Sequence, residues 1–158
     1  MGLHFEDLGR ADALDRGGLT AILFAMTDTR TLEAGCLCGA VRYRIAGPLG
    51  KQTHCHCNLC RRASGAPVVT WVTVAPGDFT LTRGILRKYR STPQGQRGFC
   101  AACGSQITFD ALNLPDEVDV TAATLDDPEA VHPEKHIWTG SRTNWLIMND
   151  GLPEREAY

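Results

Sequence analysis

The stretch GCLCGAVRYRIA, residues 35–46, joins two cysteines on a glycine-flanked turn to a segment of alternating polarity. Val41, Tyr43 and Ile45 alternate with two arginines, which is the period of a β-strand with one buried face. The glycine after the second cysteine lets the backbone curl behind the two thiols. The stretch therefore predicts a strand that begins directly after a metal-binding turn.

The chain after this strand continues as short strands separated by glycine and proline. Residues 67–75 (PVVTWVTVA) are β-branched and aromatic, and the segment is long enough for a central strand. A turn is expected at PGD, residues 76–78, and one short helix is expected at residues 58–63 with Asn58 as its N-cap. Further strands are expected at 79–82, 85–89, 106–109 and 118–124. The pattern indicates a mainly β protein with metal-bearing turns and one or two short helices.

Cysteine is abundant for a chain of 158 residues, and its seven copies are an odd number. Two pairs, Cys36/Cys38 and Cys55/Cys57, are separated by a single residue, which is a poor spacing for a relaxed disulfide. A reducing compartment also disfavours disulfides, so metal binding is the preferred interpretation. The cysteines form three clusters: CLCG at 36–39, HCHCNLC at 54–60 and CAACG at 100–104.

The first and third clusters each place two thiols on one tight turn that ends in glycine. Each turn supplies two ligands, and a closed tetrahedral zinc site needs four. The economical assignment pairs the two turns on one structural zinc, which would tie together segments more than sixty residues apart. Its ligands would be Cys36, Cys38, Cys100 and Cys103.

The middle cluster is then left with three thiols, those of Cys55, Cys57 and Cys60. Three protein ligands and one open position are typical of a catalytic zinc. His54 or His56 could instead supply a fourth ligand and close the site, although residues that flank a ligand in an extended turn tend to point away from it. A histidine that does not coordinate would support the site or pack beside it.

The composition and charge of the chain exclude some classes of function. The formal net charge of −2 gives no basic excess that would point to nucleic acid. The longest apolar stretch, residues 19–26, is far too short to cross a bilayer, and the acidic segment before it does not fit a secretory signal. We therefore expect a cytoplasmic protein with no nucleic-acid or membrane partner.

Residues 1–30 lack cysteine and differ from the rest of the chain. They are expected to form an N-terminal extension that is either helical in part or disordered, or else the natural chain starts at Met26. Residues 31–158 are expected to form a single zinc-binding domain.

Four stretches of the chain resemble the glutathione-dependent formaldehyde-activating enzyme family, a group of small zinc proteins. They are GCLCGAVRY (35–43), HCHCNLCRRASGA (54–66), RGFCAACGSQITF (97–109) and HIWTGSRTNWL (136–146). The resemblance runs from about residue 32 to about residue 152. It includes the order and spacing of all three cysteine clusters.

The resemblance implies a β-tent fold, in which two antiparallel sheets are folded over each other and carry zinc. It also implies the metal assignment given above, with two zinc ions per chain. The named activity of the family is the condensation of formaldehyde with glutathione to S-hydroxymethylglutathione, a carbon–sulfur lyase reaction in reverse. We therefore expect a zinc-dependent carbon–sulfur lyase that acts on a small thiol and an aldehyde, with glutathione as the thiol.

Glutathione carries two carboxylates, so its site should offer cations and hydrogen-bond donors. Arg61 and Arg62 directly follow the middle cluster, where they could balance its charge or hold an anionic substrate, and Trp138 could form a pocket wall. The alternative for the arginines is a solvated helix surface, and for a tryptophan it is core packing. Further candidates, which a linear sequence cannot place together, are Arg97, His136, Arg142, Asn144, Trp71 and Trp145.

Two other functions remain open. Both zinc ions could be structural in a non-catalytic binding module, a use that has a precedent in a vertebrate centromere protein similar to this family. Alternatively, the three-cysteine site could serve as a thiol or metal sensor that releases zinc on oxidation.

Overall fold

The structure is a computed structural model that describes residues 31–158. The predicted N-terminal extension therefore lies outside the described residues. Within them the chain is mainly β, with two sheets and one α-helix, which confirms the fold class predicted from the sequence. No helix in this range is long and apolar enough to cross a bilayer.

The smaller sheet has three strands in the order β1 (Thr31–Gly35), β2 (Arg42–Ala46) and β5 (Phe79–Arg83). The larger sheet has the order β10 (Lys135–Ile137), β3 (Gln52–Cys55), β4 (Val69–Val74), β9 (Val118–Thr121), β8 (Gln106–Ala111), β7 (Gly95–Phe99) and β6 (Arg87–Thr92). The neighbouring strands are antiparallel except for β10, which runs parallel to β3.

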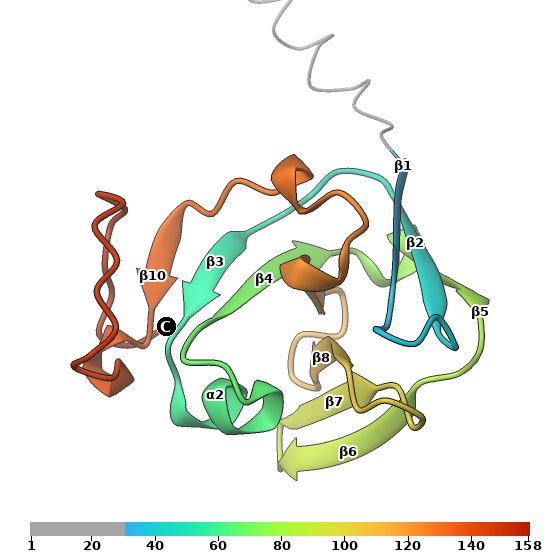
Figure 1. Ribbon diagram of the computed structural model, residues 1–158, viewed down its shortest axis with the longest axis horizontal. Coiled ribbons are helices and arrows are strands. Elements are labelled where there is room, and N and C mark those ends of the chain that lie inside the picture. The colour runs from blue at the N-terminus through green and yellow to red at the C-terminus, as the bar shows by residue number, and fades with distance from the viewer. Residues whose placement is uncertain (1–30) are drawn as a thin grey trace, which may run out of the picture.

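Short helical elements fill the connections between these strands. The α-helix α2 (Asn58–Ser64) follows β3, and Figure 1 shows it beside the ends of β6 and β7. The described part of the chain also contains four 3₁₀ turns: η1 (Pro76–Asp78), η2 (Ala122–Thr124), η3 (Pro128–Ala130) and η4 (Thr139–Ser141).

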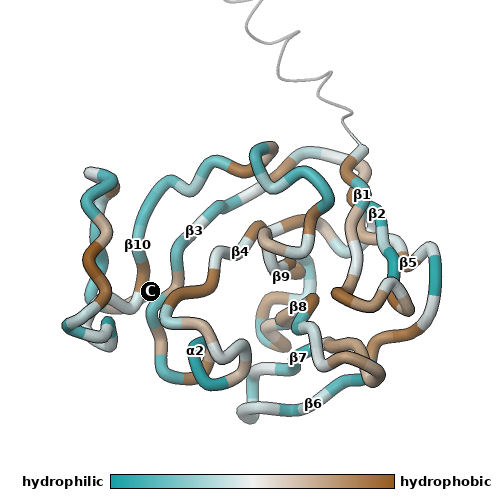
Figure 2. The backbone as a smooth tube through the Cα atoms, in the orientation of Figure 1, coloured by the Kyte–Doolittle hydropathy of each residue, from teal (hydrophilic) through white to brown (hydrophobic). Residues whose placement is uncertain are grey.

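The main core lies between the two sheets. Tyr43 and Ile45 of the smaller sheet are fully buried, and so are Val72, Ile107 and Val120 of the larger one. Burial of such side chains supplies most of the free energy that holds the sheets together. Figure 2 shows hydrophobic colour along part of β4 and mostly hydrophilic colour along β10, which is an edge strand of the larger sheet.

The central strand β4 is buried on both faces, which explains its continuous run of β-branched and aromatic residues. Val72 and Val74 belong to the main core, whereas Val69 and Trp71 belong to a second cluster. That second cluster contains Cys55, Cys60 and Ile137 as well. The strand therefore separates the folding core from the three-cysteine cluster.

Several local predictions are confirmed by these elements. Val41, just before β2, and Tyr43 and Ile45 within it are all buried, as the alternation predicts. The helix begins at Asn58 as expected, but its N-cap is Cys57, whose sulfur accepts a hydrogen bond from the Cys60 N–H. The prediction of Asn58 as N-cap was therefore wrong, because a sulfur replaced the usual oxygen acceptor.

Four strands were not predicted from the sequence: β1, β3, β7 and β10. They have three to five residues each, and their sequences (TLEAG, QTHC, GQRGF and KHI) are rich in polar residues and glycine. Such segments lack the alternation on which strand prediction depends. Their pairing is decided by neighbours that lie far away along the chain.

The buried Ile107 offers a test of the inter-sheet core. Ile107→Ala should lower the free energy of unfolding by about 2–5 kcal/mol, because it leaves a cavity between two packed sheets. Urea denaturation at saturating zinc measures the change. Ile85, which is 79% exposed, provides the control, and Ile85→Ala should stay within about 0.5 kcal/mol of the parent. Equal losses for both variants would contradict this description of the core.

Candidate metal centres and cavity

Each of the two sheets has a turn between paired antiparallel strands that carries two cysteines. Cys36 and Cys38 lie in the turn between β1 and β2, and Cys100 and Cys103 lie in the turn between β7 and β8. Each turn ends in a glycine with a positive φ angle, +72° at Gly39 and +78° at Gly104. This left-handed conformation is nearly free of strain only for glycine, so the sequence pattern has a direct structural reason.

The four sulfurs of these turns converge on one point, with all of them within 4.8 Å of one another. The sulfur of Cys38 lies 3.6 Å from that of Cys36 and 3.8 Å from that of Cys100. A tetrahedral zinc with Zn–S bonds of about 2.3 Å requires sulfurs about 3.8 Å apart. The donor set and its spacing therefore fit a four-thiolate zinc site.

Hydrogen bonds to the sulfurs support this arrangement. The N–H of Val41 donates to the sulfur of Cys36 at 3.2 Å. The hydroxyl of Ser105 lies 3.2 Å from the sulfur of Cys103 and accepts the N–H of Leu37 at 3.1 Å. The Ser105 hydroxyl, followed by backbone N–H groups, lowers the pKa of Cys103 to about 5. Ser105 thus links the two turns and favours the thiolate form that binds metal.

The second group comprises Cys55 at the end of β3, Cys57 at the N-cap of α2 and Cys60 in its first turn. Their sulfurs also lie within 4.8 Å of one another. Hydrogen bonds from Cys55 and Cys60 lower the pKa of Cys57, and the pKa of Cys55 is raised in return. Three such thiols do not all ionise together unless a cation lies between them. The cluster therefore fits a metal ion with three thiolate ligands.

One buried arginine contacts this cluster. Arg97, on β7, is only 5% exposed, and its Nη2 donates to the sulfur of Cys60 at 3.6 Å. Arg97 lies opposite Phe109 in the β7–β8 register, and its guanidinium stacks on that ring at 4.9 Å. Three thiolates and a divalent ion carry a net charge of −1, so this guanidinium neutralises the site. In the sequence Arg97 was one of several candidates for binding substrate carboxylates.

The three-cysteine group opens into a cavity of about 500 Å³, which we call the cysteine cavity. Its walls are mostly apolar and come from distant segments, and the first turn of α2 contributes Asn58, Leu59 and Cys60. The lining side chains include Leu59, Trp71, Phe109, Leu114, Ile137, Trp138, Glu117, Asp119 and Tyr158. An apolar cavity with few polar groups is typical of a small-molecule site.

The structure brings some of the predicted substrate-binding residues to this cavity and leaves others elsewhere. Trp138 lines the cysteine cavity. Arg61 donates instead to the carbonyl of Ser141 and to the side chain of Asn58. Arg62 lines a separate cleft on the other side of Leu59.

The remaining candidates are divided in the same way. Trp71 is buried against the three-cysteine cluster and lines its cavity. Arg142 forms an ion pair with Glu154 at 2.8 Å, and it shares a different surface hollow with Asn144. Trp145 is 72% exposed.

The histidines near the three-cysteine group form hydrogen bonds to residues outside both cysteine groups. His56 and His136 are fully buried, and their rings are joined by a 2.8 Å hydrogen bond. His136 also bonds the carboxylate of Asp150 at 3.0 Å, and His54 bonds the hydroxyl of Thr70 at 2.9 Å. Desolvation, followed by the charge of Arg142, lowers the pKa of His56 to about 4. These side chains support β3 and β10 from behind the cluster.

Several cavity residues had no signal in the sequence. Phe109 reads as an ordinary strand residue, Ile137 falls in no predicted strand, and Tyr158 is the last residue of the sequence. The hydroxyl of Tyr158 lies 3.2 Å from Nζ of Lys51, which itself pairs with Glu117. The pairing of β10 with β3 brings Ile137 to the cavity, and Phe109 reaches it through the pairing of β8 with β7 and β9.

Together these features define a class of mainly β protein with a four-thiol group and a three-thiol group that opens into a cavity. The sequence model of one family, described as glutathione-dependent formaldehyde-activating enzyme, matches residues 31–141. The chain belongs to this family, as the resemblance of its cysteine clusters predicts.

Individual proteins support this placement. A protein from Halomonas elongata, provisionally named as a glutathione-dependent formaldehyde-activating enzyme, is 27% identical over 133 residues, which cover 78% of this chain and 85% of the relative. A crystal structure of a Rhodobacter sphaeroides protein aligns with a TM-score of 0.51 at 21% identity, over 78% of this chain and 99% of that one. The second likeness concerns the fold alone.

The two thiol groups should respond differently to substitution. Cys103→Ser should unfold or aggregate the protein, because it opens a link between segments 62 residues apart. Cys57→Ser should keep the fold and lose about one zinc per chain, because serine is itself a good N-cap for α2. Circular dichroism and zinc content by mass spectrometry measure both outcomes. Equal loss of structure in the two variants would remove the distinction between the groups.

The hydroxyl of Ser105 offers a separate test of the four-thiol group. Ser105→Ala removes the hydrogen bonds to Cys103 and Leu37, and it should weaken zinc binding there by about 10- to 100-fold. Competition with a chromophoric chelator measures the affinity. The three-thiol group acts as the internal control, since its affinity should not change. An unchanged affinity at the four-thiol group would show that Ser105 does not support it.

Proposed function

We propose that this protein is a zinc-dependent enzyme of the carbon–sulfur lyase type that adds a thiol to an aldehyde. The family name supports glutathione and formaldehyde as the substrates. In this proposal Cys36, Cys38, Cys100 and Cys103 hold a structural zinc, and Cys55, Cys57 and Cys60 hold a second zinc at which substrates bind. The protein would carry two zinc ions and work in the cytoplasm.

The observation that carries the proposal is the position of the three-thiol group at the wall of a cavity of about 500 Å³. The ligand set lacks a fourth protein donor within the described residues, because His54 bonds Thr70 and His56 bonds His136. A site with three ligands and a cavity beside it is typical of a catalytic rather than a structural zinc. This arrangement favours the enzyme over a purely structural module.

The reaction breaks two bonds, the thiol S–H bond and the carbonyl π bond, and it forms a C–S bond and an O–H bond. The sulfur of the thiol forms a bond to the aldehyde carbon, the carbonyl π bond breaks, and the proton of the thiol ends on the former carbonyl oxygen. A bound zinc would supply a Lewis acid that favours the thiolate form of the substrate.

The residues of the chain provide the surroundings of this reaction. The guanidinium of Arg97 offsets the negative charge of the cysteine thiolates. Trp71, Phe109 and Trp138 give the cavity apolar walls. In such low-dielectric surroundings each electrostatic interaction is stronger than in bulk water.

The direct test is the rate of S-hydroxymethylglutathione formation, followed by NMR exchange between formaldehyde and glutathione. Zinc-loaded wild type should accelerate this exchange above the uncatalysed rate, and folded Cys57→Ser at equal concentration should not. Cys57→Ser is a suitable comparison because it keeps the N-cap of α2 while it removes a ligand. Equal rates with two zinc ions confirmed in the wild type would exclude this reaction as the function.

A further inference from the structure

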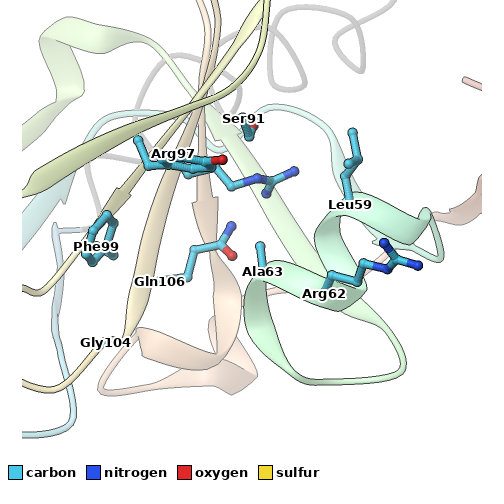
Figure 3. A pocket seen from close by; sticks show the side chains of 9 residues that line it. Leu59, Arg62, Ala63, Ser91, Arg97, Phe99, Gly104 and Gln106 are labelled. Atoms are coloured by element: carbon cyan, nitrogen blue, oxygen red, sulfur yellow. The ribbon is translucent and has the colours of Figure 1, made fainter.

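A second hollow lies on the other side of Leu59 from the cysteine cavity. It has a volume of about 560 Å³ and lies between α2 and the strands β6, β7 and β8; we call it the α2 cleft. Figure 3 shows Arg97 and Gln106 extending from the sheet toward the helix that carries Leu59, Arg62 and Ala63. No cysteine of either thiol group lines this cleft.

Two polar side chains in the α2 cleft are nearly buried and have unused hydrogen-bonding groups. Gln106 is 9% exposed and Arg97 is 5% exposed. Within residues 31–158, neither amide atom of Gln106 nor Nη1 of Arg97 has a hydrogen-bond partner. A buried polar group without a partner destabilises a protein by about 1–3 kcal/mol, so such groups are normally satisfied. Three of them on one cleft indicate a polar ligand.

The charge of the cleft selects the kind of ligand. Arg97 and Arg62 are the charged side chains that line it, and its described lining includes no acidic residue. Guanidinium groups bind carboxylates through paired hydrogen bonds. The Gln106 carboxamide offers both a donor and an acceptor, which are the groups that a peptide amide requires. By contrast, Glu117 and Asp119 line the cysteine cavity, where they would repel a carboxylate.

Arg97 connects the two hollows. It lines both of them together with Leu59, and its Nη2 lies 3.6 Å from the sulfur of Cys60 while Nη1 is free. A ligand that passes Leu59 can therefore place sulfur near the cysteines and a carboxylate near the same guanidinium.

From these contacts we infer that the α2 cleft binds the carboxylate and peptide-amide part of the thiol substrate. Gln106 pairs with the amide, and Arg97 and Arg62 pair with the carboxylate. The aldehyde then occupies the apolar cysteine cavity. This inference rests on the proposed function, because it concerns the thiol that reacts at the three-cysteine group.

The test uses S-methylglutathione, a thioether that keeps both carboxylates and both amides but cannot form the new carbon–sulfur bond. Calorimetry should show that it binds to the zinc-loaded protein. The diethyl ester of the same compound should bind at least about tenfold more weakly, because it lacks the charges that the arginines recognise. Methylthioethanol, which has neither carboxylate nor amide, should not bind measurably.

Matched variants locate the binding. Gln106→Leu should weaken S-methylglutathione binding by about tenfold, because the ligand amide loses its partner. Gln94→Leu is the control, since Gln94 is exposed at the β6–β7 turn. Arg62→Gln should weaken binding as well, whereas Arg87→Gln, which makes the same charge change on the exposed face of β6, should not. Zinc content and thermal melting are measured for each variant.

The outcomes separate this inference from the proposed function. Accelerated exchange without binding of S-methylglutathione, or binding that Gln106→Leu and Arg62→Gln leave unchanged, would overturn the α2 cleft as the thiol site while the reaction stands. Equal binding of the diester would overturn the role of the carboxylates. Specific binding in the cleft without accelerated exchange would support the cleft and would reject the reaction.

Discussion

Four cysteine sulfurs join the smaller sheet to the larger one at a single point. Cys36 and Cys38 lie on the turn that leads from β1 to β2, and Cys100 and Cys103 lie on the turn from β7 to β8. Tyr43 packs in the core between the two sheets. This core can be densely packed only if the two sheets meet at a fixed separation. The four-thiol group fixes that separation near the turns. Val72 and Val74 of β4 pack in the same core.

The three-cysteine group has a different relation to the chain. Its members lie within six residues, so a metal ion there closes no long loop and contributes little to the joining of the sheets. Its surroundings, however, come from several distant strands. Arg97 comes from β7, Phe109 from β8 and Ile137 from β10. The three ligands are therefore close together in the sequence, whereas the charge and the shape of the cavity depend on the tertiary fold.

This difference explains what the sequence could predict. The alternation of Val41, Tyr43 and Ile45 predicted β2, because that signal is local. The spacing of the cysteines within each turn is local too, and the four ligands that a tetrahedral zinc needs then predicted which turns meet. The contact between Arg97 and Cys60 was not predictable, since it requires β7 and α2 to meet across 37 residues. Likewise, the short strand β10 has no pattern of its own, and its parallel pairing with β3 depends on tertiary contacts.

Cys57 belongs to two structures at once, the thiol group and the first turn of α2. Its sulfur accepts the N–H of Cys60, and the same sulfur would bind a cation through another of its lone pairs. The loading of the three-thiol group is therefore coupled mechanically to the start of the helix that forms one side of the α2 cleft. Leu59 and Arg62 lie less than two helical turns from Cys57. A shift of the start of α2 on metal binding would therefore move side chains that line both hollows.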